Sequence, residues 1–257
     1  MATHRKDFRP RGGRWPTLLA GLALLLLISA TLMMGGAGPA YRGEFVTLGE
    51  AFNLLRNGVY AAAGAVAFSI LVLLVSMVSR RTVPALMAML ILTGAAALLY
   101  VPWQHWQRAQ DVPAIHDITT DTQNPPAFEV LADARETAPN AVDYPGEETA
   151  RQQRAAYPGI QPLVVNDAPQ TVLAAAQAEV EAAGWQIAHI TDNRIEATAT
   201  TRWFGFEDDV VIRLTETENG VQIDMRSASR LGTSDVGTNA ARIETFLEAL
   251  GARLGTT

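Results

Sequence analysis

Charged side chains gather near the C-terminus of the chain, where they could bind an anion or pair with one another. The candidate ligand-binding residues are Arg202, Asp208, Asp209, Arg226, Arg230, Asn239 and Arg242. A guanidinium group donates two parallel hydrogen bonds to a carboxylate or a phosphate, so these arginines could line a pocket for an anionic small ligand. In the second interpretation, Arg226 and Arg230 pair with Asp208 and Asp209 across neighbouring strands and stabilise the fold.

A second candidate site contains His116, Asp117 and Asp121, which have the residue types of a general base or a metal site. The serines of the C-terminal region lie outside the Gly-x-Ser-x-Gly and Ser-x-x-Lys patterns, so no nucleophile is evident. The chain has no cysteine, and its four histidines lack zinc-binding spacing, so we expect no metal and no cofactor. A hydrogen-bonded structural role and a catalytic role both stay open for these three residues.

Three aromatic residues, Trp203, Phe204 and Phe206, stand close together in a predicted hairpin loop. They could insert into a membrane surface or close a groove for a lipid or a peptide. The alternative is that they fold back on the core of the sheet.

Strand periodicity places two further sets of residues. Asp208 and Asp209 are adjacent in a predicted strand, so we expect their side chains to point to opposite faces of the sheet. They are therefore not a ready carboxylate pair for acid and base catalysis. His189 follows Trp185 and Ile187 at alternate positions, which predicts a partly buried histidine on the core face.

Three uncharged apolar stretches, near residues 17–34, 57–79 and 82–101, indicate a membrane anchor in residues 1–101. At a rise of about 1.5 Å per residue, each stretch can cross most of a hydrocarbon layer of roughly 30 Å. None of them contains Asp, Glu, Lys, Arg or His, and transport pathways usually need such a group. We therefore expect an anchor rather than a transporter.

The cations beside these stretches predict the orientation, because cytoplasmic flanks of membrane helices are rich in Lys and Arg. Those that decide it are Arg5, Lys6, Arg9, Arg11 and Arg14 before the first stretch, and Arg80 and Arg81 between the second and third. The N-terminus is then cytoplasmic, and the C-terminal domain is periplasmic or extracellular. If the first stretch were instead a cleaved signal peptide, with residues 35–40 as its processing site, the domain would still lie outside.

The soluble part divides into a proline-rich segment, residues 102–166, and an α+β core, residues 167–257. In the first we expect only a short strand at 114–120 and short helices at 128–135 and 147–156, because frequent prolines exclude long helices. The core has the pattern helix, four strands, helix, with strands at 185–190, 194–201, 209–215 and 221–227. This predicts a two-layer fold with a four-stranded antiparallel sheet. Helices cover one face, and the other is wet or covered by the proline-rich segment.

Polar residues and glycine mark the expected ends of the two helices of this core. Asp167 and Gln170 have the spacing of a capping box ahead of the first helix, and Gly184 is expected to end it. Ser234 or Asp235 is expected to cap the last helix.

The soluble part is acidic, which limits the classes of partner. From residue 102 onward there are 11 arginines, no lysine and 23 Asp plus Glu, so its net charge is 11 − 23 = −12. Nucleic acid and anionic lipid headgroups would both be repelled at long range by this charge. The expected partners are the lipid bilayer, through the three helices, and an envelope protein or an anionic small ligand. An oligomer could form through the anchor.

Several separated blocks of the soluble part together resemble one known family. They are residues 115–121, 124–128, 156–163, 202–210 and 226–243, which include Asn124-Pro125-Pro126-x-Phe128 and Arg202-Trp203-Phe204-Gly205-Phe206. These blocks are similar to domain of unknown function 1499 (DUF1499). The resemblance implies a bacterial protein, with membrane helices ahead of the domain, and it implies no activity.

These observations favour a membrane-anchored extracytoplasmic protein of the bacterial cytoplasmic membrane, acting as a binding or scaffold module of the cell envelope. The alternative function is that of an envelope hydrolase or metal-dependent enzyme. It would use His116, Asp117 and Asp121, with the arginines as an anion clamp.

Overall fold

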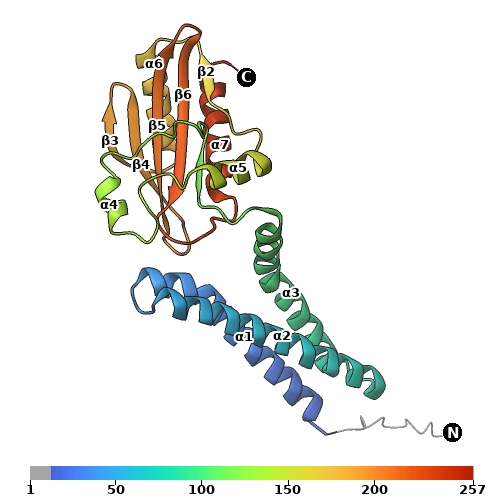
Figure 1. Cartoon of the computed structure of the whole chain (residues 1–257). Helices are drawn as coiled ribbons and strands as arrows, with labels where there is room; N and C mark the ends of the chain where they lie inside the picture. The colour runs from blue at the N-terminus through green and yellow to red at the C-terminus, as the bar shows by residue number, and fades with distance from the viewer. Residues whose placement is uncertain (1–12, 257) are drawn as a thin grey trace, which may run out of the picture. The chain divides into compact units, whose positions relative to one another are not determined.

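The structure, a computed structural model, describes residues 13–256 and consists of two compact units that divide after Gln104 (Figure 1). The long helices are α1 (Trp15–Arg42), α2 (Leu48–Ser79) and α3 (Thr82–Asp111). All three are long and apolar enough to cross a membrane, which confirms the three predicted membrane helices. Arg5, Lys6, Arg9 and Arg11, on which the predicted orientation partly rests, lie outside the described residues.

Helix α3 extends beyond the apolar stretch from which it was predicted. It passes through Pro102 and ends only at Asp111. At about 1.5 Å per residue, the part after Val101 adds roughly 15 Å of helix. The beginning of the predicted proline-rich segment is therefore helical.

Small side chains allow the anchor helices to pack closely. The buried residues of α2 recur at steps of four and three, like the seam of a coiled coil, and include Gly58, Ala62, Ala65, Ser69, Val72 and Ser76. A Cβ atom on Gly58 would lie only 2.4 Å from Cγ of Met34 in α1. The small residues of α2 therefore permit a close approach of the helices within the anchor.

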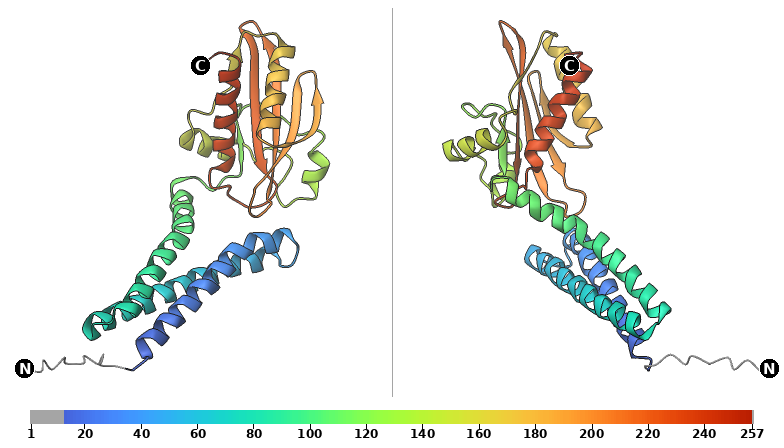
Figure 2. Two further views of the ribbon diagram at one scale, coloured as in Figure 1. Left: turned by 180° about the vertical axis from the view of Figure 1, so that it is seen from behind. Right: turned by 90° about the vertical axis from the view of Figure 1, so that its right-hand side faces the viewer.

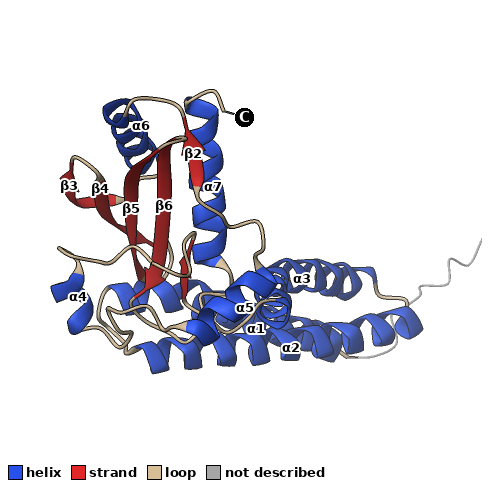
Figure 3. Ribbon diagram, turned by 45° about the horizontal axis from the view of Figure 1, so that its top comes forward, coloured by secondary structure: helices blue, strands red, loops and turns tan. Residues whose placement is uncertain are grey.

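The second unit is built on an antiparallel sheet of six strands (Figure 3). The strands are β1 (Asp117–Thr119), β2 (Leu163–Val165), β3 (Gln186–Thr191), β4 (Arg194–Thr200), β5 (Glu207–Thr217) and β6 (Gly220–Ser229). Their order is β1-β6-β5-β4-β3, and β2 pairs with the other end of β6. The α+β class and the antiparallel sheet are confirmed, but the predicted number of four strands is wrong.

The two additional strands come from the proline-rich segment and share one edge of β6. Asp117 of β1 pairs with Ala228, and Leu163 of β2 pairs with Ile223. β1 lies inside the short strand predicted at 114–120, whereas β2 was not predicted. Each has only three residues, too few for an alternating pattern to show in the sequence.

Both faces of the sheet are covered (Figure 2). Helices α6 (Pro169–Ala182) and α7 (Thr238–Arg253) lie on one face, over a core that includes Val210, Ile212, Ile223, Met225 and Ile243. On the other face lie α4 (Ala132–Glu136), α5 (Glu147–Ala156) and the loops around them. A smaller core there consists of Phe128, Leu131, Val211 and Ala228. The sequence predicted that this face is either wet or covered by the proline-rich segment. It is covered by part of that segment, residues 120–162, which we call the cover.

Helix α6 begins two residues after the predicted cap. Its N-cap is Ala168, which is extended at φ −64° and ψ 143°, and Pro169 is its first residue. The predicted capping box of Asp167 with Gln170 is therefore wrong. A residue before proline avoids the helical conformation, and proline fits the first helical position, so the helix cannot start earlier. Gly184, at φ +71°, follows the end of α6 as predicted.

Helix α7 also begins later than predicted, at Thr238, because Gly237 before it is left-handed at φ +77°. Asp235 nevertheless caps the helix. Its carboxylate accepts hydrogen bonds from the backbone N–H groups of Gly237 at 2.9 Å and Asn239 at 2.7 Å. The capping role of Asp235 is therefore confirmed, although two residues separate it from the helix.

His189 is exposed, so the prediction of a partly buried histidine is wrong. The register of β3 on β4 shifts between Ile187, which pairs with Ala197, and His189, which pairs with Glu196. This bulge inserts one residue and reverses the face to which the following side chain points. Ile190 is consequently the next half-buried residue of β3.

Gly220 permits β2 to lie beside β6, and we expect its replacement by alanine to destabilise the domain strongly. Gly220 has φ +116°, and an added Cβ atom would lie 2.1 Å from the carbonyl oxygen of Val165. Backbone strain of about 1–2 kcal/mol and overpacking of about 1–3 kcal/mol should lower the free energy of unfolding by roughly 3 kcal/mol. Urea unfolding of the full chain, followed by tryptophan fluorescence, measures this loss.

The matched control is Gly184→Ala, because Gly184 also has a positive φ but no atom within 4 Å of the added Cβ position. Its loss should be limited to the strain of about 1–2 kcal/mol. Equal losses for the two variants would contradict a steric role of Gly220.

Candidate functional site

Asp208 and Asp209 of β5 point to opposite faces of the sheet, as predicted. Asp208 contacts Arg242 of α7 at 2.6 Å, whereas Asp209 contacts Arg135 of α4 at 3.1 Å. Both carboxylates are buried. Each therefore belongs to a different polar network, one beneath the helices and one beneath the cover.

The helix-face network consists of Asp208, Ser227, Ser229, Asn239 and Arg242. Arg242 donates to Oδ2 of Asp208 at 2.6 Å, to Oγ of Ser227 at 2.9 Å and to Oδ1 of Asn239. The side-chain amide of Asn239 donates to Oγ of Ser229 at 3.0 Å and to the carbonyl oxygen of His116 at 2.9 Å. The network thus connects β5, β6, α7 and the chain ahead of β1.

Asp235 lies beside this network at the start of α7. Burial raises the pKa of its carboxyl, and the backbone N–H groups of Asn239 and Gly237 lower that pKa in part. The negative charge of Asp208 raises the pKa further, and Arg242 lowers it. The amide groups at the helix terminus thus partly offset the cost of a buried charge at Asp235.

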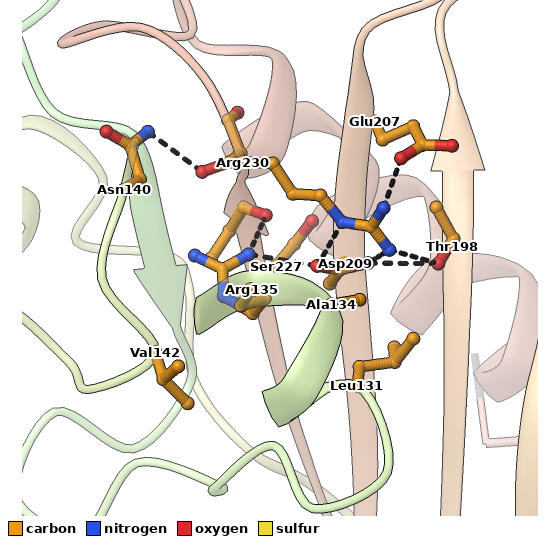
Figure 4. Close-up of polar contacts among 12 residues, drawn as sticks. Leu131, Ala134, Arg135, Asn140, Val142, Thr198, Glu207, Asp209, Ser227 and Arg230 are labelled. Carbon is orange, nitrogen blue, oxygen red and sulfur yellow. Dashed lines mark hydrogen bonds and ion pairs between the residues drawn. The ribbon is translucent and has the colours of Figure 1, made fainter. Parts of the chain in front are cut away.

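The cover-face network surrounds Asp209 and consists of Asp209, Arg135, Arg230, Thr198 and Glu207 (Figure 4). Arg230 donates two hydrogen bonds to Asp209, each 2.8 Å long, and also pairs with Glu207. Arg135 donates to Asp209 at 3.1 Å, and the hydroxyl of Thr198 donates at 2.9 Å. Two arginines here face one fully buried and one half-exposed carboxylate, so the charges balance within the network.

Arg135 was not identified from the sequence, although its side chain is completely buried. Besides Asp209, it donates to the carbonyl oxygens of Ala228 at 2.9 Å and Ala141 at 3.0 Å. Its helix has only five residues and shows no periodic pattern. One available signal was the absence of lysine from the whole domain, since arginine is the cation that suits buried bidentate pairs.

Arg226 pairs with Asp117 rather than with Asp208 or Asp209. The pair is bidentate, with hydrogen bonds of 3.0 and 2.8 Å, and both side chains are buried. Register explains the choice, because Thr119 of β1 lies opposite Arg226, whereas Asp208 and Asp209 lie opposite Ser229 and Ala228. The alternation of the strand then places Asp117 on the same face as Arg226.

The guanidinium of Arg226 also fastens the cover. It donates to the carbonyl oxygens of Pro126 at 3.2 Å and Val142 at 2.9 Å. The ring of Phe128 lies 4.6 Å from the guanidinium carbon of Arg226 and 4.8 Å from that of Arg135. Phe128 is therefore held by two cation–π contacts.

The three candidate catalytic residues have separate partners. Asp117 is bonded to Arg226, and Asp121 accepts the N–H groups of Gln123 and Asn124 at 3.0 and 2.9 Å. Asp121 also contacts Arg213 at 3.2 Å. His116 is half-buried, and within residues 13–256 its Nδ1 has no hydrogen-bond partner. Residues 13–256 also contain no group of three His, Cys, Asp or Glu side chains that could hold a metal ion.

Two further polar side chains hold the cover and were not identified from the sequence. The buried carboxylate of Glu196 accepts the N–H groups of Glu129 and Leu131, each at 2.9 Å. The buried side chain of Gln153 exchanges hydrogen bonds of 3.0 and 2.6 Å with the backbone of Thr119. Glu196 thus bonds to backbone N–H groups of the cover, and Gln153, from the cover, bonds to the backbone of β1.

The predicted aromatic residues lie in the loop between β4 and β5, residues 201–206. The rings of Phe204 and Phe206 stack at a centroid distance of 4.9 Å, and Trp203 packs on Phe204 at 5.2 Å. Trp203 retains 41% of its surface exposed. Arg202 is exposed and lies in neither network.

A shallow groove of about 310 Å³ lies elsewhere on the domain, between α7 and the chain that leads into β2. Its lining includes Ile160, Pro162, Ile243, Glu244 and Leu247. None of the predicted site residues lines it.

Comparison with known families identifies this domain. The family model for a protein of unknown function, DUF1499, matches residues 117–250, which is more than half of the chain. The chain belongs to the DUF1499 family. A search among curated proteins finds no match.

The DUF1499 match begins at Asp117, the partner of Arg226, and extends beyond Arg242, the partner of Asp208. All members of the helix-face and cover-face networks therefore lie inside it, and the three anchor helices lie outside.

Because Asp117 neutralises a buried guanidinium, we expect Asp117→Ala to destabilise the DUF1499 domain. Breaking a buried ion pair by removing one partner costs about 3–5 kcal/mol, since the other charge stays buried. The matched control is Glu148→Ala, which removes the exposed pair with Arg151 and should cost far less, because solvent screens exposed charges. Urea unfolding of both full-length variants measures the difference, and similar small losses would contradict a structural role for Asp117.

Proposed function

We propose that this DUF1499 protein is a membrane-anchored binding or scaffold module whose domain lies outside the cytoplasmic membrane of a bacterial cell. The observation that carries this proposal is the internal pairing of the arginines. Arg226, Arg230 and Arg242 each bond to a buried carboxylate of the same domain. Groups that hold a fold together are poorly placed to be exchanged during a catalytic cycle.

The charges around the anchor support the proposed side of the membrane. Arg80 and Arg81 lie between α2 and α3, and Arg14 directly precedes α1. The region around the connection between α1 and α2 carries Arg42 and Arg56 beside Glu44 and Glu50, so its charges balance. This distribution favours a cytoplasmic α2–α3 turn and an external DUF1499 domain.

A protein partner is better supported than an anionic small ligand. In the cover-face network, an anion that approached Arg230 would have to displace Glu207, and Asp209 would repel it from beneath. The domain as a whole carries a net charge of 11 − 23 = −12 from residue 102 onward, which adds to the repulsion.

In the alternative enzyme, Asp117 would have to break its ion pair with Arg226. Asp121 would have to give up its hydrogen bonds with the backbone N–H groups of Gln123 and Asn124. Release of Arg226 would leave a buried donor without its partner, at a cost of about 1–3 kcal/mol. The hydrolase or metal-dependent function is therefore less well supported.

Reporter fusions test the proposed side of the membrane. Alkaline phosphatase fused after Gly255 should be active, and green fluorescent protein fused there should be dark, because only the phosphatase folds well outside the cytoplasm. Fusions after Arg81, in the α2–α3 turn, are the control and should give the reverse result. A fluorescent C-terminal fusion with an inactive phosphatase would contradict the external location.

Co-purification tests binding against an arginine clamp. We expect the full chain and its Arg230→Gln variant, both extracted from native membranes, to retain the same protein partner by mass spectrometry. Arg230→Gln should still fold, because Asp209 keeps its bonds to Arg135 and Thr198. An anionic small molecule that accompanies only the unmodified chain would sink the scaffold proposal and favour the clamp.

A further inference from the structure

The loop between β4 and β5 lies at the end of the sheet where the chain arrives from the membrane anchor. Thr200 pairs with Glu207 at the base of this loop, and the next residue, Asp208, pairs with Ser229. At the same end, Asp117 of β1 pairs with Ala228. Asp117, the first residue of the sheet, and the aromatic loop thus lie at the same end of the sheet. Strands β6 and β5 connect them.

The tether between the bilayer and this end of the sheet is short. Helix α3 continues for roughly 15 Å beyond the apolar stretch that ends at Val101, and only residues 112–116 then separate it from β1. Five extended residues span at most about 18 Å. The strand β5, with 11 residues at about 3.4 Å each, separates the two ends of the sheet by roughly 35 Å.

The turns at one end of the sheet are polar, whereas the β4–β5 loop at the other end is aromatic, the composition that favours a membrane surface. The turns at the far end are Asp192-Asn193 and Glu218-Asn219, which are acidic or polar. The near loop is Arg202-Trp203-Phe204-Gly205-Phe206, with three aromatic rings and one cation. The aromatic loop thus lies at the end of the sheet to which the chain from the anchor is connected.

The shape of the loop also suits insertion at a membrane surface. Thr201 closes it, since its backbone N–H donates to the carbonyl of Phe206 at 2.8 Å and its hydroxyl accepts the N–H of Phe206 at 2.8 Å. Phe204 stacks on Phe206, and Trp203 lies outermost with 41% of its surface exposed. Indole rings favour the headgroup layer, where the ring is partly buried and its N–H can reach water.

We propose that the β4–β5 loop is a second membrane contact of this protein, with Trp203, Phe204 and Phe206 in the headgroup layer of the bilayer that α1, α2 and α3 cross. The contact would orient the domain on the membrane and present its far end, with the two acidic turns, to a partner. It rests on the membrane tether of the proposed function, and it holds whichever side of the membrane the domain occupies.

The absence of cysteine from the chain allows a direct measurement of depth. Single nitroxide labels are placed at Arg202→Cys in the aromatic loop and at Glu218→Cys in the far turn of the same sheet. The full chain is reconstituted in vesicles of phosphatidylcholine, whose headgroup carries no net charge. Power saturation then compares the collision rates of each label with oxygen, which concentrates in lipid, and with a water-soluble nickel chelate.

We expect the ratio of oxygen to nickel collisions to be several-fold higher at 202 than at 218. Replacing Trp203 and Phe204 by serine, with the label still at 202, should lower that ratio to the value found at 218. Circular dichroism and an unchanged ratio at 218 show that the domain remains folded.

Equal ratios at 202 and 218 would overturn the membrane contact. So would a label at 202 that neither reagent reaches, because the loop would then be covered by protein. Neither result would affect the reporter test of sidedness, and a failed reporter test would not affect this one.

Discussion

The buried guanidinium groups of Arg226 and Arg135 hold two layers of the domain together. Each bonds to a carboxylate beneath it and also to backbone carbonyl oxygens. The cover has little regular secondary structure, so its backbone polar groups need partners other than a helix or a ladder. Arginine supplies up to five donors in one plane and can satisfy a carboxylate and two carbonyls together. The irregular cover can therefore lie on a sheet face with the carbonyl oxygens of Pro126, Ala141 and Val142 paired to guanidinium groups.

The same constraint explains why residues that look catalytic in the sequence are packed inside the fold. A carboxylate is needed wherever a guanidinium is buried, so Asp117, Asp208 and Asp209 occupy positions that are almost closed to solvent. Phe128 completes the arrangement, because the electron-rich face of its ring lies against both guanidinium groups. Polar residues here bond chiefly to one another.

The anchor and the domain achieve close packing by different means because their surroundings differ. In a membrane, lipid tails are as apolar as the side chains, and burial alone gives helices little reason to associate. The layers Ala20, Val72, Ala88 and Ala23, Ala65, Ile91 use small residues that bring the backbones together. In the DUF1499 domain, water drives apolar burial under α6 and α7, and ion pairs fix the cover on the other face.

Residue order alone was enough to predict three helices that can cross a membrane, the α+β class, strands β3 to β6 and the approximate positions of α6 and α7. Each of these features follows from a periodic pattern that lies within a single segment of the chain. The pairing of β1 and β2 with β6, the bulge that turns His189 outward and the burial of Arg135 became evident only in the folded chain. So did the partner of Arg226, which is 109 residues away in the chain. Such pairings depend on which strands become neighbours and in what register, and no local pattern records that choice.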